Sequence, residues 1–314
     1  MFKKIVVVGI GETSLDPDYW KRIENVGESI VKLTKDSTEI GKELADADCL
    51  LVGFGVKVDE NMIVNSPKLS YIGMLGTGYG NIDVDYARVR NITVTNVPGY
   101  ATESVAELVF GMILNHIREL EKAQQRAREG DYSDSGYSSS EIRSKVFGVI
   151  GLGRNGSRVA EIALGFGADV RYWSRNRKKE LESKGVKFED IDSLIPKCDF
   201  LSLHLALTKG TEKFLDDKRI SILKGGALVV NTSPMEIVDV DALDKRLDKG
   251  DVTFILDHAD EMTEENLRKI SKHKNCTIYP PIGYGTREAR ILKQEVFLAN
   301  IESFLKGKPT NKVN

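Results

Sequence analysis

Residues 146–156 read Val-Phe-Gly-Val-Ile-Gly-Leu-Gly-Arg-Asn-Gly, and this stretch decides the fold. The apolar run Val146–Ile150 predicts a buried strand, and Ser157–Phe166 has helical spacing. Between them, Gly-x-Gly-x-x-Gly is typical of a dinucleotide-binding turn, in which the glycines permit a tight turn, a close pyrophosphate and close helix packing. The free N–H groups that open the helix attract phosphate. We therefore expect a nucleotide site rather than an empty glycine turn, formed by Gly151, Gly153, Arg154, Asn155 and Gly156.

Similar alternation of apolar runs and amphipathic segments extends along the rest of the chain. It predicts an α/β fold with doubly wound, Rossmann-like parallel sheets covered by helices. Roughly ten strands in one chain indicate two sheets and two domains. The other predicted strands are Ile5–Val8, Cys49–Val52, Leu69–Leu75, Ile92–Thr95, Asp169–Trp173, Asp199–His204, Ala227–Asn231, Thr253–Asp257 and Thr277–Tyr279.

Two long helices are predicted outside this alternation. One runs from about Ala101 to Gly130 and places His116 on its apolar stripe, as a packed core or interface residue. The polar stretch 131–140 predicts a surface loop. The last helix is predicted over about Arg287 to Lys306.

Composition excludes several classes of function. The 45 basic and 47 acidic side chains give a net charge of −2, which argues against a nucleic-acid or acidic-membrane binder. No apolar run approaches the ~18 residues that a membrane span needs. Three scattered cysteines form no zinc or disulfide pattern, so we expect no metal site and a reducing, cytoplasmic location.

The turn after the predicted strand Asp169–Trp173 bears on cofactor choice. An NAD-binding turn places a carboxylate there to hold the ribose 2′-hydroxyl, whereas this run is Ser-Arg-Asn-Arg-Lys-Lys over residues 174–179. A guanidinium suits a 2′-phosphate by its planar fork. We therefore expect NADP(H) rather than NAD(H), held by Ser174, Arg175 and Arg177; a solvated basic turn without preference is the alternative.

Motifs along nearly the whole chain carry a resemblance to one family. They are Leu75-Gly-Thr-Gly-Tyr-Gly-Asn-Ile-Asp83, Asn96-Val-Pro-Gly99, Ser104-Val-Ala-Glu107, Val149 to Gly156, Leu201-Ser-Leu-His204, Asn231-Thr-Ser233 and Pro280-Pro-Ile-Gly283. In this order they resemble the D-isomer-specific 2-hydroxyacid dehydrogenases. The resemblance implies a nucleotide domain, residues 100–287, inserted into a substrate domain made of residues 1–99 and 288–314. It also implies a homodimer formed through the nucleotide domains.

The resemblance assigns further site residues. Asp257 matches the aspartate that hydrogen-bonds the nicotinamide carboxamide, and His204 matches a histidine that lines the cofactor without transferring a proton. Thr232, Ser233 and Gly283 match positions that approach the cofactor. The substrate cleft is expected to include Gly76, Thr77, Gly78, Tyr79 and Tyr100.

The family's three catalytic residues are not found at their positions. Pro234 stands where an arginine binds the substrate carboxylate, Met262 where a glutamate supports the histidine, and Pro281 where that histidine donates the proton. Proline has neither a charge nor a titratable group. Cofactor binding therefore looks retained while the usual keto-acid chemistry does not.

The sequence consequently does not identify the proton donor. His258, Glu261 and Tyr284 are candidates, whereas His273 between two lysines is expected to be an exposed loop residue. The sequence favours an oxidoreductase with an atypical small-molecule substrate. The alternatives are a non-catalytic nucleotide-binding sensor or partner-binding protein, and an enzyme that uses another adenine-containing ligand.

Overall fold

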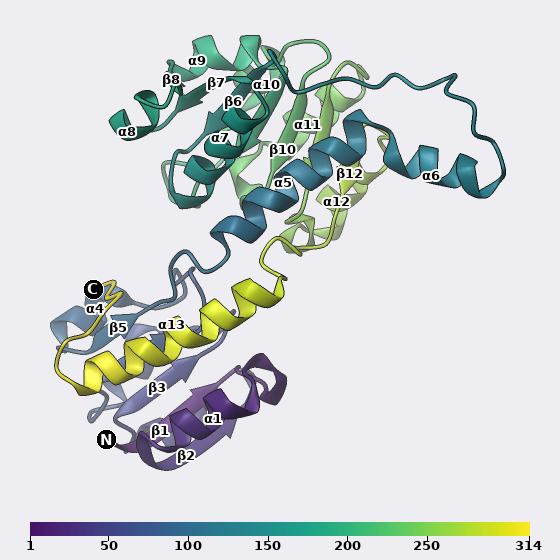
Figure 1. Cartoon of the computed structure of the whole chain (residues 1–314). Coiled ribbons are helices and arrows are strands. Elements are labelled where there is room, and N and C mark those ends of the chain that lie inside the picture. Colours follow the sequence, from purple (N-terminus) through teal and green to yellow (C-terminus); the bar gives the residue numbers. More distant parts are fainter. The chain divides into compact units, whose positions relative to one another are not determined.

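The computed structural model describes residues 1–314, which divide into two compact units. Unit 1 contains Met1–Tyr100 and Thr286–Asn314, and unit 2 contains Ala101–Gly285. Figure 1 shows both as parallel sheets with helices on their faces. The predicted α/β fold with two parallel-sheet domains is confirmed.

The sheet of unit 1 has five parallel strands in the order β2-β1-β3-β4-β5. Their bounds are β1 Phe2–Val8, β2 Gly27–Leu33, β3 Cys49–Val52, β4 Tyr71–Met74 and β5 Thr93–Thr95. Alternate residues of β1 enter two apolar layers, because successive side chains point to opposite faces.

The last helix, α13 (Arg287–Leu305), forms as predicted. It buries Phe297, Leu298 and Ile301 in the same apolar layer as Tyr71 of β4, and so returns the end of the chain to unit 1. The other helices of unit 1 are η1 Glu12–Ser14, α1 Pro17–Glu24, α2 Ile40–Leu44, α3 Glu60–Val64 and α4 Val84–Val89.

The sheet of unit 2 has seven parallel strands in the order β12-β11-β10-β9-β6-β7-β8. Their bounds are β6 Val146–Ile150, β7 Asp169–Trp173, β8 Lys187–Phe188, β9 Phe200–Leu203, β10 Leu228–Asn231, β11 Thr253–Leu256 and β12 Cys276–Ile278. Because all strands are parallel, their carboxyl ends meet at one edge of the sheet, here called the carboxyl edge, and their amino ends meet at the opposite amino edge.

Helices cover both faces of this sheet. Helices α5 and α7 share one apolar layer, and α9 to α12 contribute to the other. The helices are α5 Thr102–Ile117, α6 Leu120–Arg128, α7 Arg154–Gly165, α8 Lys179–Glu182, α9 Ile191–Leu194, η2 Ile195–Lys197, α10 Asp217–Ser221, η3 Met235–Ile237, α11 Val240–Leu247, η4 Ala259–Glu261 and α12 Glu264–Ser271.

Some sequence predictions are wrong. The single helix over 101–130 is two helices, because Glu119 adopts a left-handed conformation (φ 50°) between α5 and α6. His116 is exposed in the single chain and so does not belong to the core; its place at an interface stays a prediction. His273 is not solvated: its side chain is 8% exposed and its Nε2 lies 2.7 Å from an oxygen of Asp244. The strands β2 and β8 were not predicted, and both are edge strands of partly exposed residues.

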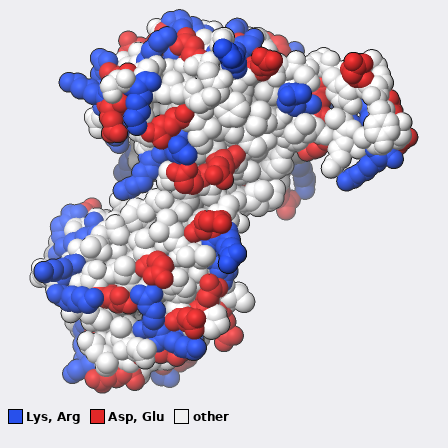
Figure 2. Space-filling view, viewed as in Figure 1, with Lys and Arg blue, Asp and Glu red and all other residues white.

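The surface mixes both charges. On the face drawn in Figure 2, acidic and basic side chains are interspersed over each unit, as the near-zero net charge suggests. No helix combines the length and the apolar character needed to cross a bilayer.

Candidate functional site

The predicted cofactor residues gather at the carboxyl edge of the unit 2 sheet. The glycine turn follows β6, the basic turn follows β7, His204 follows β9, and Asp257 follows β11. A parallel sheet binds ligands at this edge. Motifs that are far apart in the sequence thus lie along one continuous surface, because the strands that carry them are neighbours in the sheet.

The glycine turn has the geometry that a pyrophosphate needs. Gly151 has φ 92°, and a Cβ there would collide with the carbonyl oxygen of His204; a Cβ on Gly156 would collide with the carbonyl oxygen of Gly151. At Gly153, in contrast, a Cβ would meet no protein atom within 4 Å. Gly153 also precedes α7 without any side-chain cap, so the N–H groups of the first turn stay free for an anion. This open backbone fits a dinucleotide phosphate.

A cavity of about 300 Å³ lies beside this turn. Arg175 and Lys178 line it, and no carboxylate pairs with either side chain. Arg177 does not line it, because its guanidinium binds Glu182 through contacts of 2.9 and 2.8 Å. The other lining residues are Gly151, Leu152, Gly153, Trp173, Ser174, Asn176, His204, Leu205, Ala206, Thr208, Gly210, Thr211 and Phe214. The sequence predicted the basic run 174–179 as a whole, but it gave no sign of the 205–214 loop, which carries no motif.

The remaining two residues of the turn are placed differently. Arg154 is exposed at the start of α7. Asn155 accepts a hydrogen bond from the Thr102 hydroxyl at 3.3 Å, which joins the glycine turn to the start of α5.

His204 is held as a neutral imidazole. Its Nε2 lies 2.8 Å from the hydroxyl of Ser202 and its Nδ1 lies 3.4 Å from that of Thr232. Burial lowers the pKa of His204 to about 4. The ring can therefore line a cofactor but is not the protonated imidazolium that could act as a general acid at neutral pH, in keeping with the role that the resemblance implies.

Ser233 braces the turn between strands. Its hydroxyl donates to the carbonyl oxygen of Leu203 and accepts from the N–H of Leu205, both at 3.1 Å. Its own N–H donates to Asn231. These bonds occupy the Ser233 side chain, so its predicted approach to the cofactor would depend on backbone atoms.

Asp257 is a buried carboxylate with an unmet hydrogen-bonding capacity. Its side chain is 2% exposed, and no donor lies within hydrogen-bond distance of its Oδ1. Burial raises the pKa of Asp257 to about 6, against the opposing influence of His258. A Cβ on Gly283 would lie 3.1 Å from its Oδ2. A neutral N–H donor such as a nicotinamide carboxamide would satisfy this atom, so the residues present fit the cofactor.

Two of the candidate proton donors, His258 and Glu261, lie near Asp257. The imidazole of His258 is 3.9 Å from Asp257 Oδ1 and 4.0 Å from Glu261 Oε1, both longer than a hydrogen bond. Burial raises the pKa of Glu261. Tyr284 is 48% exposed on the loop after β12.

The resemblance places Pro234, Met262 and Pro281 at the family's catalytic positions, and these residues lie in the loops after β10, β11 and β12. Pro234 precedes η3 and Pro281 is partly buried. Met262 packs against the apolar layer and lines a cavity of about 320 Å³. No group of three or more His, Cys, Asp or Glu side chains is arranged to hold a metal ion.

The predicted substrate-cleft residues belong to unit 1. The Thr77 hydroxyl donates to the carbonyl oxygen of Val97 at 2.8 Å, and Gly76 accepts from the Val97 N–H at 2.8 Å. A Cβ on Gly78 would meet no atom within 4 Å, and Tyr79 is 38% exposed. The Lys293 ammonium lies 5.5 Å from the centre of the Tyr100 ring.

Comparisons with known proteins agree on a family. A family model described as "D-isomer specific 2-hydroxyacid dehydrogenase, NAD binding domain" matches residues 110–283. A glyoxylate reductase of Thermococcus litoralis is 35% identical over 286 residues, which cover 87% of this chain and 85% of that protein.

Two solved structures share the fold and part of the sequence. A D-lactate dehydrogenase from Aquifex aeolicus, complexed with NAD and lactic acid, is 28% identical with a TM-score of 0.85, and the match covers 97% and 96% of the two chains. An acyclic imino acid reductase (Bsp5), in complex with NADPH and D-Arg, is 29% identical with a TM-score of 0.87, covering 99% and 100%.

Proposed function

Since the chain belongs to the D-isomer-specific 2-hydroxyacid dehydrogenase family, we propose that it is an NADP(H)-dependent oxidoreductase that does not use the family's usual acid–base chemistry. Arg175 and Lys178 line the cavity after β7 without carboxylate partners, and this observation supports NADP(H). A carboxylate, which would repel a 2′-phosphate, is absent from residues 174–179. When bound, the nicotinamide supplies or accepts the hydride.

The chain's own residues would hold the cofactor from both ends. The open backbone around Gly153 and the start of α7 would hold the pyrophosphate, and Arg175 with Lys178 would hold the 2′-phosphate. The unmet Oδ1 of Asp257 would accept from the carboxamide. Neutral His204 would line the site between these contacts.

The charge of the three loops that follow β10, β11 and β12 supports a cationic substrate. Residues 232–239, 257–263 and 279–285 contain no lysine or arginine. They contain five acidic residues, Glu236, Asp239, Asp257, Asp260 and Glu261, of which Asp239 is paired with Lys213. A 2-keto acid would meet carboxylates where the family places an arginine. We propose an imine in its protonated form, which such a loop set would attract.

The same substrate class accounts for the missing histidine. Hydride addition to a carbonyl carbon leaves an alkoxide, which requires a proton donor. A protonated imine already carries its proton, so the added hydride gives a neutral amine and no protein acid is needed. Pro281 would then be compatible with catalysis. The similarity to an imino acid reductase that binds NADPH supports this proposal.

The deciding experiment follows NADPH oxidation with acetaldehyde or acetone, whose imines are cationic when protonated, and with glyoxylate or pyruvate, which keep a carboxylate. Each compound is supplied alone and with methylamine, which forms the imine in solution. We expect turnover only in the presence of the amine. Turnover by the keto acids alone would contradict the proposed substrate class. Equal use of NADH and NADPH would contradict the cofactor preference.

A non-catalytic sensor or partner-binding role is the second candidate. Pro234, Met262 and Pro281 favour it as well, because all three familiar catalytic positions are changed while the glycine turn is kept. Tight binding of NADPH with no turnover on either substrate type would support it. Calorimetry with other adenosine compounds would identify a different adenine-containing ligand.

We also infer a homodimer formed through unit 2. Helix α6 buries none of its residues and projects from the rest of unit 2 together with the 130–140 loop (Figure 1). Lys122 and Arg126 flank the Tyr137 ring at 5.0 and 5.1 Å, so this arm is ordered by its own contacts. Sedimentation velocity should give twice the mass of the 34.9 kDa chain, and a monomer would overturn the inference.

A cytoplasmic location is inferred from the cysteines. Cys49, Cys198 and Cys276 are all free and buried, which is compatible with a reducing compartment. Fractionation of cells that express the tagged protein would test it.

A further inference from the structure

The basic turn after β7 is anchored by a buried tyrosine. The ring of Tyr172 is fully buried, and its hydroxyl accepts a hydrogen bond from the N–H of Lys178 at 2.8 Å. The same hydroxyl donates to Glu182 Oε1 at 2.7 Å. One phenol group therefore joins the backbone of the turn to the last residue of α8.

Glu182 is the second anchor. Both of its carboxylate oxygens bind Arg177, at 2.9 Å to Nε and 2.8 Å to Nη2. The Arg177 guanidinium also lies 5.0 Å from the centre of the Phe188 ring, and Phe188 packs edge-on against Tyr172 at 5.4 Å. Tyr172, Arg177, Glu182 and Phe188 thus form a closed cluster, here called the turn anchor.

The turn anchor gives the cations of the turn two different roles. Arg177 is committed to Glu182, in a bidentate geometry that fixes the guanidinium. Arg175 and Lys178 have no carboxylate partner and line the 300 Å³ cavity. The turn is fixed at its other end, where the carbonyl oxygen of Trp173 accepts from the N–H of Gly151 at 2.9 Å. The five residues 174–178 therefore span two fixed points.

We propose that Glu182, acting through Tyr172 and Arg177, is a positioning residue that sets the preference for a 2′-phosphorylated dinucleotide by holding Arg175 and Lys178 toward the cavity. This inference rests on the proposed NADP(H) function. Arg177, which the sequence suggested as a phosphate ligand, instead serves as the counter-ion of the turn anchor. A fixed turn loses less conformational freedom when the phosphate binds, so affinity depends on the anchor as well as on the cations.

The test compares affinities for NADPH and NADH in Glu182→Gln and Tyr172→Phe. Glutamine cannot pair ionically with Arg177, and phenylalanine keeps the buried ring but removes the hydroxyl. We expect each change to weaken NADPH binding by about three- to tenfold, the loss of roughly one hydrogen bond's contribution, with NADH affinity unchanged. Because both residues act on the same turn, the double variant should lose less than the product of the two single effects.

Matched variants separate the possible outcomes. Glu180→Gln alters a neighbouring carboxylate of α8 that is 86% exposed and pairs only with Lys184, so it should leave both affinities unchanged. Equal losses for NADPH and NADH, no loss, or a gain in NADPH affinity would each overturn the positioning role. If Arg175→Gln abolishes the preference while Glu182→Gln does not, only the positioning role fails. If the unaltered protein shows no preference, the proposed NADP(H) function fails.

Discussion

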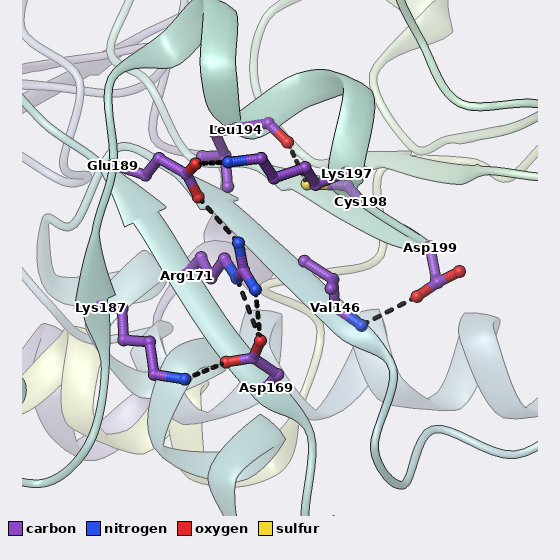
Figure 3. Close-up of polar contacts among 9 residues, drawn as sticks. All are labelled: Val146, Asp169, Arg171, Lys187, Glu189, Leu194, Lys197, Cys198 and Asp199. Carbon is purple, nitrogen blue, oxygen red and sulfur yellow. Dashed lines mark hydrogen bonds and ion pairs between the residues drawn. The ribbon is translucent and has the colours of Figure 1, made fainter.

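The two edges of the unit 2 sheet differ in whether their charged side chains have ionic partners within the protein. From the amino edge at Asp169, along β7 to Glu189 beyond β8, ionic groups are paired in series: Lys187 and Arg171 bind Asp169, Arg171 also binds Glu189, and Glu189 binds Lys197 (Figure 3). Nearby, Asp199 accepts from the N–H of Val146 at 2.9 Å and from Lys224 at 2.6 Å.

At the carboxyl edge, by contrast, several charges lack partners, although Arg177 is paired with Glu182. Arg175 and Lys178 have no carboxylate, and Asp257 Oδ1 has no donor. Of these three groups only Asp257 is buried. An unpaired buried charge costs stability, so its position at the edge that binds ligands is informative. The comparison indicates that charged groups are paired within the protein where they only hold strands together. They lack a protein partner where a bound ligand can supply one.

Gly153→Val should produce the largest effect at the carboxyl edge. Its backbone is extended (φ −74°, ψ −161°) and a Cβ meets no protein atom, so the change in unfolding free energy should stay within about 1 kcal/mol. The side chain would nevertheless occupy the place of the pyrophosphate. We expect the affinity for both cofactors to fall by about 100-fold or more, or about 3 kcal/mol, as measured by calorimetry. Gly165→Ala, at the open end of α7, is the control and should bind normally.

Arg175→Gln should have a smaller and more selective effect. Loss of one charge-assisted contact should weaken NADPH binding by about 1–3 kcal/mol and leave NADH binding unchanged. Because Arg175 pairs with no protein carboxylate, the unfolding free energy should not fall. Fluorescence titration with each cofactor measures the ratio. A ratio that stays constant would show that the turn takes no part in cofactor choice.

Asp257→Asn tests the cost of the unpaired carboxylate. The folded-state pKa of about 6 lies above the ordinary value of 3.8, so the stability contributed by this group is complete below pH 3.8 and is lost as the pH rises through 6. The free energy of unfolding of the asparagine variant should therefore exceed that of the unaltered protein by about 1–3 kcal/mol at pH 8. This gain should vanish near pH 4. Urea denaturation at both pH values checks this. A gain that is independent of pH would contradict the assignment.

Much of the fold could be predicted because local patterns determine it. The strand-turn-helix around Gly151–Gly156 and helix α13 form as expected. The edge strand β2 was missed because its residues 27–33 are mostly part-exposed and lack a clear apolar run. The break at Glu119 was missed because a left-handed glutamate has no sequence signature.

The candidate site could be predicted only where residues adjacent in the sequence define it. The residues predicted to approach the cofactor follow the strand ends, which the motifs locate. The commitment of Arg177 could not be foreseen, because it depends on Glu182 and on Phe188 in an unpredicted strand. The missing partner of Asp257 likewise depends on the packing of several loops.

Arg171→Gln should produce the smallest effect of these variants. It should lower stability and leave cofactor affinity unchanged, whereas Arg175→Gln should do the reverse. Arg171 is 24% exposed and links Asp169 to Glu189, but Lys187 and Lys197 would still pair with those carboxylates. We expect a loss of about 1 kcal/mol in unfolding free energy and unchanged affinities for both cofactors.

The pH dependence of that loss should also be the reverse of that at Asp257. Lys187 and Arg171 hold the pKa of Asp169 below its usual range, despite partial burial, so the stability from this pairing is present above the unfolded pKa and is lost as the pH falls through the folded one. The difference between Arg171→Gln and the unaltered protein should therefore shrink in acid, whereas the effect of Asp257→Asn appears only as the pH rises. Urea titrations of both variants across the same pH series measure the two trends. Trends of the same sign would mean that the two edges of the sheet do not differ in how they pair their charges.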